Sequence, residues 1–196
     1  MGGRRPGQPQ VAQVYAMVDS GEPDTIIARL QPFAELAPLV QQSVQLTTYA
    51  RVMANADLGP QHGAGEPYSR SALVGRITRE FAREAERMLE SGDAGFFQLR
   101  SVGGAVADVA EDATAYAHRS ASFSVIAIGA TEDRLDAAWA RLDEHTAGMY
   151  LSFDSSLRPE RIEEAFPPAT LARLRAIKAQ VDPDGVFVDN FAITTA

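Results

Sequence analysis

Three hydrogen-bonding side chains alternate along one short stretch of the sequence, "DATAYAHR" (Asp112–Arg119). In a strand, Thr114, Tyr116 and His118 would share one face, because successive side chains of a strand point to opposite faces. A hydroxyl, a phenol and an imidazole in a row could line a small-molecule pocket and exchange protons with its occupant. The pattern is also typical of a surface strand with an exposed tyrosine and a hydrogen-bonded histidine, and periodicity alone favours this second interpretation.

Other kinds of catalytic and metal site find little support in the sequence. The chain has no cysteine, which excludes disulfides, thiolate metal sites and a cysteine nucleophile. Its three histidines lie far apart without the spacing of metal ligands, so we predict no metal site. No glycine-rich loop with a Lys-Ser/Thr end is present to hold a phosphate. The acidic stretch "DPDG" (Asp182–Gly185) predicts a turn before it predicts a metal site.

Composition and charge are those of an ordinary globular protein. Of 196 residues, 45% are hydrophobic and 22% are charged, which is enough apolar surface for a core. The net charge of −8 without a basic block argues against nucleic acid or an anionic membrane as the main partner. No apolar run approaches the roughly 20 residues that a membrane helix needs. We therefore expect a cytoplasmic protein.

The first ten residues, "MGGRRPGQPQ", carry charge with no apolar stretch behind them. They predict a flexible lead-in over residues 1–10, or the point at which a longer chain was cut. The length of the chain favours a single domain over residues 11–196.

Hydrophobic periodicity predicts a first β-α-β unit near the start of the chain. Alternating apolar residues indicate a strand over residues 11–18, and a weaker strand is expected over residues 39–46. Between them, apolar residues at helical spacing follow Pro23, which suits a first helical position. Pro32 should kink or split this helix.

A longer insertion follows the first unit. The glycine- and proline-rich residues 55–68 predict a loop, and residues 71–91 predict a long helix that Gly92 ends. Two short strands, the second within "AVADV" (Ala105–Val109), are expected to join at Gly103–Gly104.

A second β-α-β unit is predicted near the end of the chain. Residues 120–129 are apolar on both faces, which indicates a central strand. A helix capped by Thr131 and ended by Gly148 follows, and then a strand over residues 149–153. A last helix is expected to turn Leu171, Leu174, Ile177 and Val181 inward.

Together these elements predict an α+β fold. It consists of a largely antiparallel sheet with helices packed on one face, built from two β-α-β units with an inserted helix. The second face of the sheet then needs a cover, which could be a ligand, another copy of the chain or another domain.

Several stretches, in this order along the chain, resemble one protein family. They are "LTTYARVMA" (Leu46–Ala54), "GGA" (Gly103–Ala105) with "DATAYAHR", "YLSF" (Tyr150–Phe153) and "LARLRAIKAQVDPDGVFVDNFAI" (Leu171–Ile193). Together they resemble the substrate domain of the berberine-bridge-enzyme-like FAD-linked oxidases, in the vanillyl-alcohol oxidase superfamily. Each stretch is weakly specific alone, but the resemblance runs from residue 11 to residue 193.

The resemblance implies a set of site residues. Asn190 would approach the flavin ring. Phe153 stands where relatives often have a tyrosine that serves as the base, so this position cannot supply a phenolate. The predicted catalytic residues are Tyr116, His118 and Tyr150, and the predicted substrate-binding residues are Thr114, Phe153 and Gln98.

The resemblance also implies a cofactor and a partner. In that family FAD lies mainly in an N-terminal domain, which this sequence lacks, so FAD is expected only with a separate FAD-binding domain. The implied reaction is oxidation of an alcohol, an amine or a related small molecule, with hydride transfer to FAD. Two alternatives stay open. One is a flavin-free module that binds a small molecule or forms a homodimer through the uncovered sheet face, and the other is a stand-alone acid–base enzyme.

Overall fold

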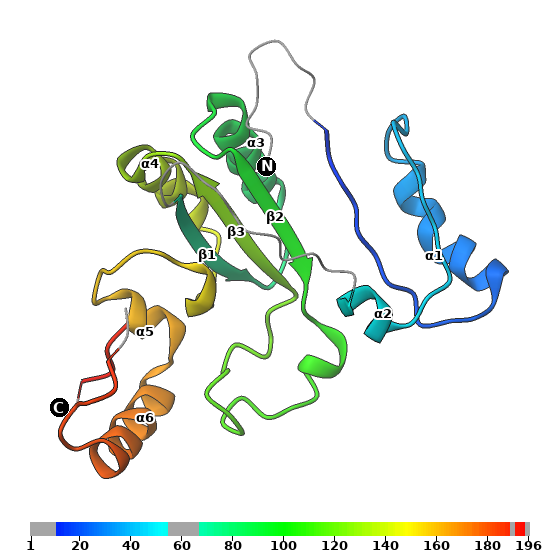
Figure 1. The fold of residues 1–196 in the computed structure, drawn as a ribbon. Helices are drawn as coiled ribbons and strands as arrows, with labels where there is room; N and C mark the ends of the chain where they lie inside the picture. Colours follow the sequence, from blue (N-terminus) through cyan, green and yellow to red (C-terminus); the bar gives the residue numbers. More distant parts are fainter. Residues whose placement is uncertain (1–10, 55–66, 189–190, 195–196) are drawn as a thin grey trace. The chain divides into compact units, whose positions relative to one another are not determined.

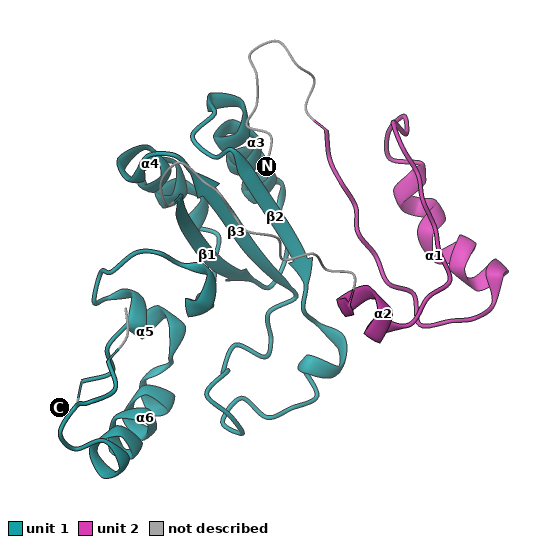
Figure 2. Ribbon diagram, in the orientation of Figure 1, with its two compact units in different colours: residues 1–5, 65–196 teal, residues 6–64 magenta. Residues whose placement is uncertain are grey.

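The computed structural model describes residues 11–54, 67–188 and 191–194. The chain divides into two compact units, residues 6–64 and residues 65–196 together with 1–5 (Figure 2). This division rests on compactness and does not show whether the two units fold separately or together. The predicted single domain over residues 11–196 therefore stays a prediction. The predicted lead-in over residues 1–10 lies outside the described residues. None of the helices in the described ranges is long and apolar enough to cross a membrane.

The unit of residues 6–64 holds two helices in its described part, α1 (Pro23–Ala34) and α2 (Tyr49–Ala54) (Figure 1). Contrary to the prediction of a split, α1 continues through Pro32. This proline lies in the last turn, where a helix loses few hydrogen bonds to the missing N–H.

The strands predicted over residues 11–18 and 39–46 are wrong, because neither segment forms a ladder. Their apolar side chains remain exposed, as for Val14, Val40 and Val44. An alternating pattern makes a strand only where a neighbouring strand pairs with its backbone N–H and C=O groups. The pattern is present in this unit and the pairing is not.

The larger unit is built on three antiparallel strands in the order β1-β3-β2: β1 (Tyr68–Val74), β2 (Phe96–Ser101) and β3 (Phe123–Gly129). The predicted central strand is confirmed as β3, and the predicted α+β class with an antiparallel sheet is confirmed. The helix predicted over 71–91 begins too early, since β1 runs to Val74. Ala72 and Val74 alternate with Ser71 and Leu73 across the two sheet faces, which is the period of a strand.

Two amphipathic helices cover one face of this sheet, α3 (Arg79–Ser91) and α4 (Glu132–Asp143) (Figure 1). The hydroxyl of Thr78 accepts a hydrogen bond from Phe81 N at 3.1 Å and begins α3. Gly92, at φ +74°, ends it as predicted. Helix α4 begins after Thr131 as predicted but ends at Asp143, before Gly148. The core between helices and sheet consists of Ala72, Val74, Phe81, Ala85, Met88, Ala94, Val125, Ala127, Leu135, Ala138, Trp139 and Leu142.

The outer edge of β1 is covered by the chain that follows α4. Leu73 N donates to Gly148 O at 2.7 Å, and Ser155 N donates to Ser69 O at 3.1 Å, so this segment runs antiparallel along the edge. It is not the predicted strand, because Leu151–Phe153 form a short 3-10 turn, η2. Covering an edge strand in this way prevents it from pairing with another chain.

One buried arginine anchors that segment. Arg161, at the start of α5 (Arg161–Ala165), donates to Asp154 Oδ2 at 2.8 Å and to Ser71 O at 3.1 Å. It also pairs with Glu164. Ser71 N donates to Asp154 Oδ2 at 3.2 Å, so the β1 edge, the loop and α5 share one network. Both the Arg161 and the Asp154 side chain are almost fully buried.

The last helix is α6 (Pro168–Val181), as predicted. Its predicted inward stripe is only partly present. Leu171 is buried, but Ile177 and Val181 are exposed, because only the first part of α6 packs against the rest of the unit. The predicted Asp182–Gly185 turn is confirmed, with Gly185 N donating to Asp182 O at 3.1 Å and Gly185 at φ +64°.

We expect Arg161→Met to lower the free energy of unfolding by about 3–5 kcal/mol, because it leaves the Asp154 carboxylate buried without its cation. Urea unfolding followed by circular dichroism measures this. The control, Arg158→Met, changes an exposed side chain and should shift the free energy by about 0.5 kcal/mol or less. Equal losses in the two variants would contradict the role of the network.

The Asp182 carboxylate should stabilise the C-terminal turn in a pH-dependent way. Its pKa is lowered, first by the Lys178 hydrogen bond and then by the N–H groups of Val186 and Phe187. The stabilisation is therefore present above the usual aspartate pKa of about 3.9 and is lost as the pH falls through the lowered value. NMR protection factors of the Val186 and Phe187 amides should fall over that range.

Asp182→Ala should remove this protection at every pH. The exposed neighbour Asp184 provides the matched control, and Asp184→Ala should keep the pH-dependent protection. Protection that does not depend on Asp182 would show that other contacts hold the turn.

Candidate functional site

A long connection over residues 102–122 joins β2 to β3 and carries three of the predicted site residues, Thr114, Tyr116 and His118. It contains a 3-10 turn, η1 (Gly104–Val106), and otherwise loops and turns. The strand predicted over residues 105–109 is therefore wrong, and Thr114, Tyr116 and His118 do not lie in the strand that would have put them on one face. The pairing of β2 with β3 ends at Ser101 and Phe123, continues only through the bond from Val102 N to Ser122 O, and gives residues 105–109 no strand partner. Connections of this length in compact proteins often carry function.

The C-terminal helices hold this connection in place. The Nε2–H of His118 donates to Glu164 O at 2.9 Å and to Ala165 O at 3.1 Å, since carbonyl oxygens can only accept. Arg173 of α6 donates to Asp112 O at 3.0 Å. The half-buried His118 thus links the loop to α5, and this is the hydrogen-bonded histidine of the second interpretation. Its predicted catalytic role stays a prediction.

A glycine makes room for the His118 ring. A Cβ on Gly148 would lie 2.3 Å from Cε1 of His118, and Gly148 has φ +114°. Both the close approach and the left-handed backbone favour glycine. The sequence pattern had assigned Gly148 to the end of a helix, and its role beside His118 depends on a contact that periodicity does not reveal.

Three of the predicted site residues come together as a row of rings. The Tyr116 and Tyr150 centroids are 6.2 Å apart with planes at 74°, an edge-to-face arrangement. The Tyr150 and Phe153 centroids are 5.5 Å apart. We call Tyr116, Tyr150 and Phe153 the ring row. Tyr116 comes from the 102–122 connection, while the other two come from η2 and the residue before it.

Two guanidinium groups that the sequence pattern did not predict as site residues lie at the two ends of the ring row. Arg100 Cζ lies 4.7 Å from the Phe153 centroid, and Arg119 Cζ lies 5.0 Å from the Tyr116 centroid. These are cation–π distances. The sequence did contain a signal for Arg100. It lies two residues after Gln98 in a predicted strand, and so on the same face as a predicted substrate-binding residue.

Two further predicted residues hold these arginines. Gln98 Oε1 accepts from Arg100 Nε at 2.7 Å, and Thr114 Oγ1 accepts from Arg119 Nη2 at 2.8 Å. Arg119 also donates to the Tyr116 carbonyl at 3.0 Å through Nε. Gln98 and Thr114, predicted to bind substrate, are thus found positioning cations, and their contact with substrate stays a prediction.

The ring row lies on the side of the sheet that α3 and α4 leave free. In the strand register Gln98 faces Ile126 and Arg100 faces Ser124, whereas the core residues Val125 and Ala127 point the other way. The predicted open face is only partly open, since Ile126 and Ser124 are 4% and 6% exposed. It opens toward β2, where Gln98 is half-buried and Arg100 is exposed.

The two phenols of the row are available to a ligand. Neither the Tyr116 nor the Tyr150 hydroxyl has a hydrogen-bond partner among the residues that the structure describes. Burial raises the pKa of Tyr116, the nearby Tyr150 raises it further, and Arg119 opposes them. At neutral pH Tyr116 is therefore an uncharged phenol that can donate a hydrogen bond.

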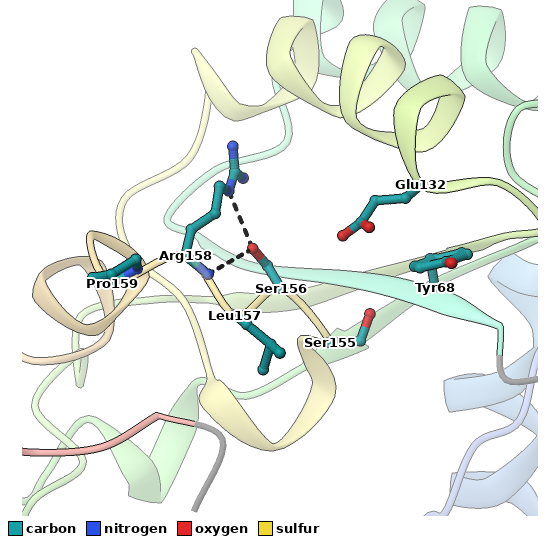
Figure 3. A pocket seen from close by; sticks show the side chains of 7 residues that line it. All are labelled: Tyr68, Glu132, Ser155, Ser156, Leu157, Arg158 and Pro159. Atoms are coloured by element: carbon teal, nitrogen blue, oxygen red, sulfur yellow. Dashed lines mark hydrogen bonds between the residues drawn. The ribbon is translucent and has the colours of Figure 1, made fainter.

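A separate hollow of about 480 Å³ lies at the start of β1 and α4 (Figure 3). At one side of the hollow, Arg158 Nε donates to Ser156 Oγ of the same loop at 3.1 Å. It is open to solvent, and no predicted site residue lines it. Its lining consists of Tyr68, Glu132, Ser155, Ser156, Leu157, Arg158 and Pro159. Asn190, the predicted flavin contact, lies outside the described residues.

We expect Tyr116 to ionise above the ordinary tyrosine pKa of about 10, and Tyr116→Phe should remove this high-pH ionisation. Ultraviolet titration of phenolate absorbance measures this while circular dichroism verifies that the protein stays folded. Tyr15→Phe removes an exposed phenol elsewhere and should leave the high-pH component unchanged. Persistence of that component in Tyr116→Phe would contradict the assignment.

No protein-family model and no curated protein matches the chain, but solved structures do. Chitooligosaccharide oxidase matches with a TM-score of 0.63 and 22% identity, over 90% of this chain and 44% of its own. 6-Hydroxy-D-nicotine oxidase from Arthrobacter nicotinovorans matches with a TM-score of 0.61 and 19% identity, over 90% of this chain and 42% of its own. Glucooligosaccharide oxidase from Acremonium strictum matches with a TM-score of 0.58 and 21% identity, over 76% of this chain and 38% of its own. That oxidase carries cysteinyl- and histidyl-linked FAD.

This chain thus spans less than half the length of each of these oxidases. At such identities the likeness concerns the fold. The resemblance predicted from the sequence motifs is confirmed at that level: the chain has the fold of one part of the FAD-linked oxidases.

Proposed function

We propose that this chain is the substrate-binding part of a flavin-dependent oxidoreductase that oxidises an alcohol, an amine or a related small molecule. The observation that carries the proposal is the ring row, with two unbonded phenols, on a fold shared with part of the FAD-linked oxidases. Aromatic walls with a few polar groups are typical of small-molecule sites.

The described residues fit the substrate side of such an enzyme and not the nucleotide side. Within residues 11–54, 67–188 and 191–194, no glycine-rich loop leads into a helix N-terminus with the residues that hold a pyrophosphate. We therefore propose that a separate FAD-binding domain holds the cofactor, which supplies the two-electron acceptor of this enzyme class.

The residues of this chain then have to bind the substrate, orient it and handle its proton. Tyr116, kept uncharged by burial, would donate a hydrogen bond to a substrate oxygen or nitrogen. Tyr150, with 40% of its surface exposed, is the better placed group to exchange the proton with solvent. Phe153 contributes only its ring. His118, bonded to two backbone carbonyls, would act by positioning the loop.

The second candidate function is a flavin-free module that binds a small molecule or pairs with a second copy. The observation in its favour is a run of exposed apolar side chains after the Asp182–Gly185 turn, where Val186, Phe187 and Val188 are 71%, 77% and 79% exposed. A colourless dimer in size-exclusion chromatography would support this candidate. The cytoplasmic location stays a prediction, as does self-association.

The proposed function predicts that an FAD-domain reading frame lies beside the coding sequence of this chain. Produced together with that domain, the chain should give a yellow complex that oxidises members of a panel of sugars, alcohols and amines. Tyr150→Phe should lower kcat by about 100-fold or more, because general acid–base groups contribute on that scale. Flavin absorbance should stay unchanged.

The exposed Tyr68 provides the control, and Tyr68→Phe should keep full activity. Unrelated genes on both sides would count against a split enzyme. Tight binding of FAD by this chain alone would show that the cofactor needs no second domain.

A further inference from the structure

We infer that the ring row binds a ring-bearing small molecule with a carboxylate, and that Arg100 is the residue that takes the carboxylate. The inference deepens the proposed function and rests on it, in that the ring row is treated as the substrate surface. It adds the charge of the substrate, which nothing in the likeness to other oxidases specifies.

The argument begins with unused hydrogen-bond donors. A guanidinium has five N–H groups. Arg100 uses Nε for Gln98, and none of its other N–H groups has a partner among the residues that the structure describes. Arg119 uses three donors, for the carbonyls of Tyr116 and Val106 and for Thr114 Oγ1. Within the described ranges neither arginine forms an ion pair with a carboxylate, although the chain has an excess of acidic residues.

Arginines without an ion pair also occur on open surface, as Arg76 does, and there they are solvated. Arg100 differs because two neighbours hold it, with the Gln98 amide oxygen at 2.7 Å from Nε and the Phe153 ring 4.7 Å from Cζ. A side chain held in place before binding loses less rotamer freedom when a ligand arrives. The free edge of such a guanidinium matches the two oxygens of a carboxylate.

The arrangement favours a carboxylate over a phosphate. The two guanidiniums stand at opposite ends of the ring row, beyond Phe153 at one end and Tyr116 at the other. Phosphate sites usually gather several cations or backbone N–H groups around one point. A single exposed guanidinium beside aromatic rings suits one carboxylate attached to a ring that packs on those rings.

Both sugar acids and aromatic acids have this chemistry, so the test uses one matched pair of each. Titration calorimetry of the 196-residue chain at low ionic strength compares methyl β-D-glucuronide with methyl β-D-glucoside, and 4-hydroxybenzoate with 4-hydroxybenzamide. In at least one pair the acid should bind about tenfold more tightly than its neutral partner. The pair with this preference identifies the source of the carboxylate. Added salt should weaken the preference.

Three variants locate the charge that is responsible. Arg100→Gln should abolish the preference for the acid, Arg100→Lys should keep part of it, and Arg76→Gln removes an equal charge elsewhere and should leave it unchanged. Unfolding curves that match the parent chain show that each variant is folded.

The inference is overturned if acid and neutral partner bind equally in both pairs, or if none of the four compounds binds. It is also overturned if the preference survives in Arg100→Gln, or if inorganic phosphate competes as strongly as the carboxylate. Flavin does not enter this assay. A failure of the proposed function would therefore be seen separately, in the absence of an active complex with an FAD-binding domain.

Discussion

The ion pair between Arg161 and Asp154 is the interaction on which the arrangement of the larger unit depends. Two charges removed from water are tolerated only when further hydrogen bonds satisfy them, and the backbone of Ser71 supplies such bonds to both. Because Ser71 belongs to the outer edge of β1, the pair fixes the segment after α4 along that edge. The same contact sets the position of η2 and of α5.

The candidate site follows from that placement. η2 and the residue before it bring Tyr150 and Phe153 over the free face of the sheet, while α5 offers the two carbonyls that hold His118. His118 in turn holds the connection that carries Tyr116 and Arg119. The helices α3 and α4 contribute no residue to the site. Their apolar stripes bury the opposite face of the sheet and leave the face of β2 that carries Gln98 and Arg100 free.

The electrostatics of the site differ from those of the chain as a whole. A protein of net charge −8 keeps two arginines against aromatic rings without an acidic partner in the described residues. Gln98 takes one donor of Arg100, and Thr114 with the carbonyls of Tyr116 and Val106 takes three donors of Arg119, which leaves the other N–H groups of Arg100 without a partner in the described residues. Together with the uncharged phenol of Tyr116, the free N–H groups of Arg100 give the ring row and its flanking arginines an excess of hydrogen-bond donors. Such a surface complements an electron-rich or anionic substrate.

Local patterns predicted the elements whose structure depends on local physics. The doubly apolar run of β3, the helices α4 and α6, Gly92 as the end of α3 and the Asp182–Gly185 turn are all present. The failures at residues 11–18, 39–46 and 105–109 share one cause, whereas residues 149–153 lie beside the β1 edge and are interrupted by the η2 turn. A strand exists only with a pairing partner, and alternation of side chains carries no information about which segment lies alongside.

For the site, the sequence by itself determined which residue types are available and which chemistry they exclude. It placed a phenol, an imidazole and a hydroxyl close together, left the chain without thiols, and put a phenylalanine, which has no proton to exchange, at position 153. Only the tertiary structure decided their roles. It turned His118 toward the backbone of α5 and Tyr116 toward Tyr150, and it brought Arg100 of β2 to the end of the ring row. The physical reason is that these contacts join residues far apart in the sequence, and they depend on the backbone positions that the sheet and the buried Arg161 network provide.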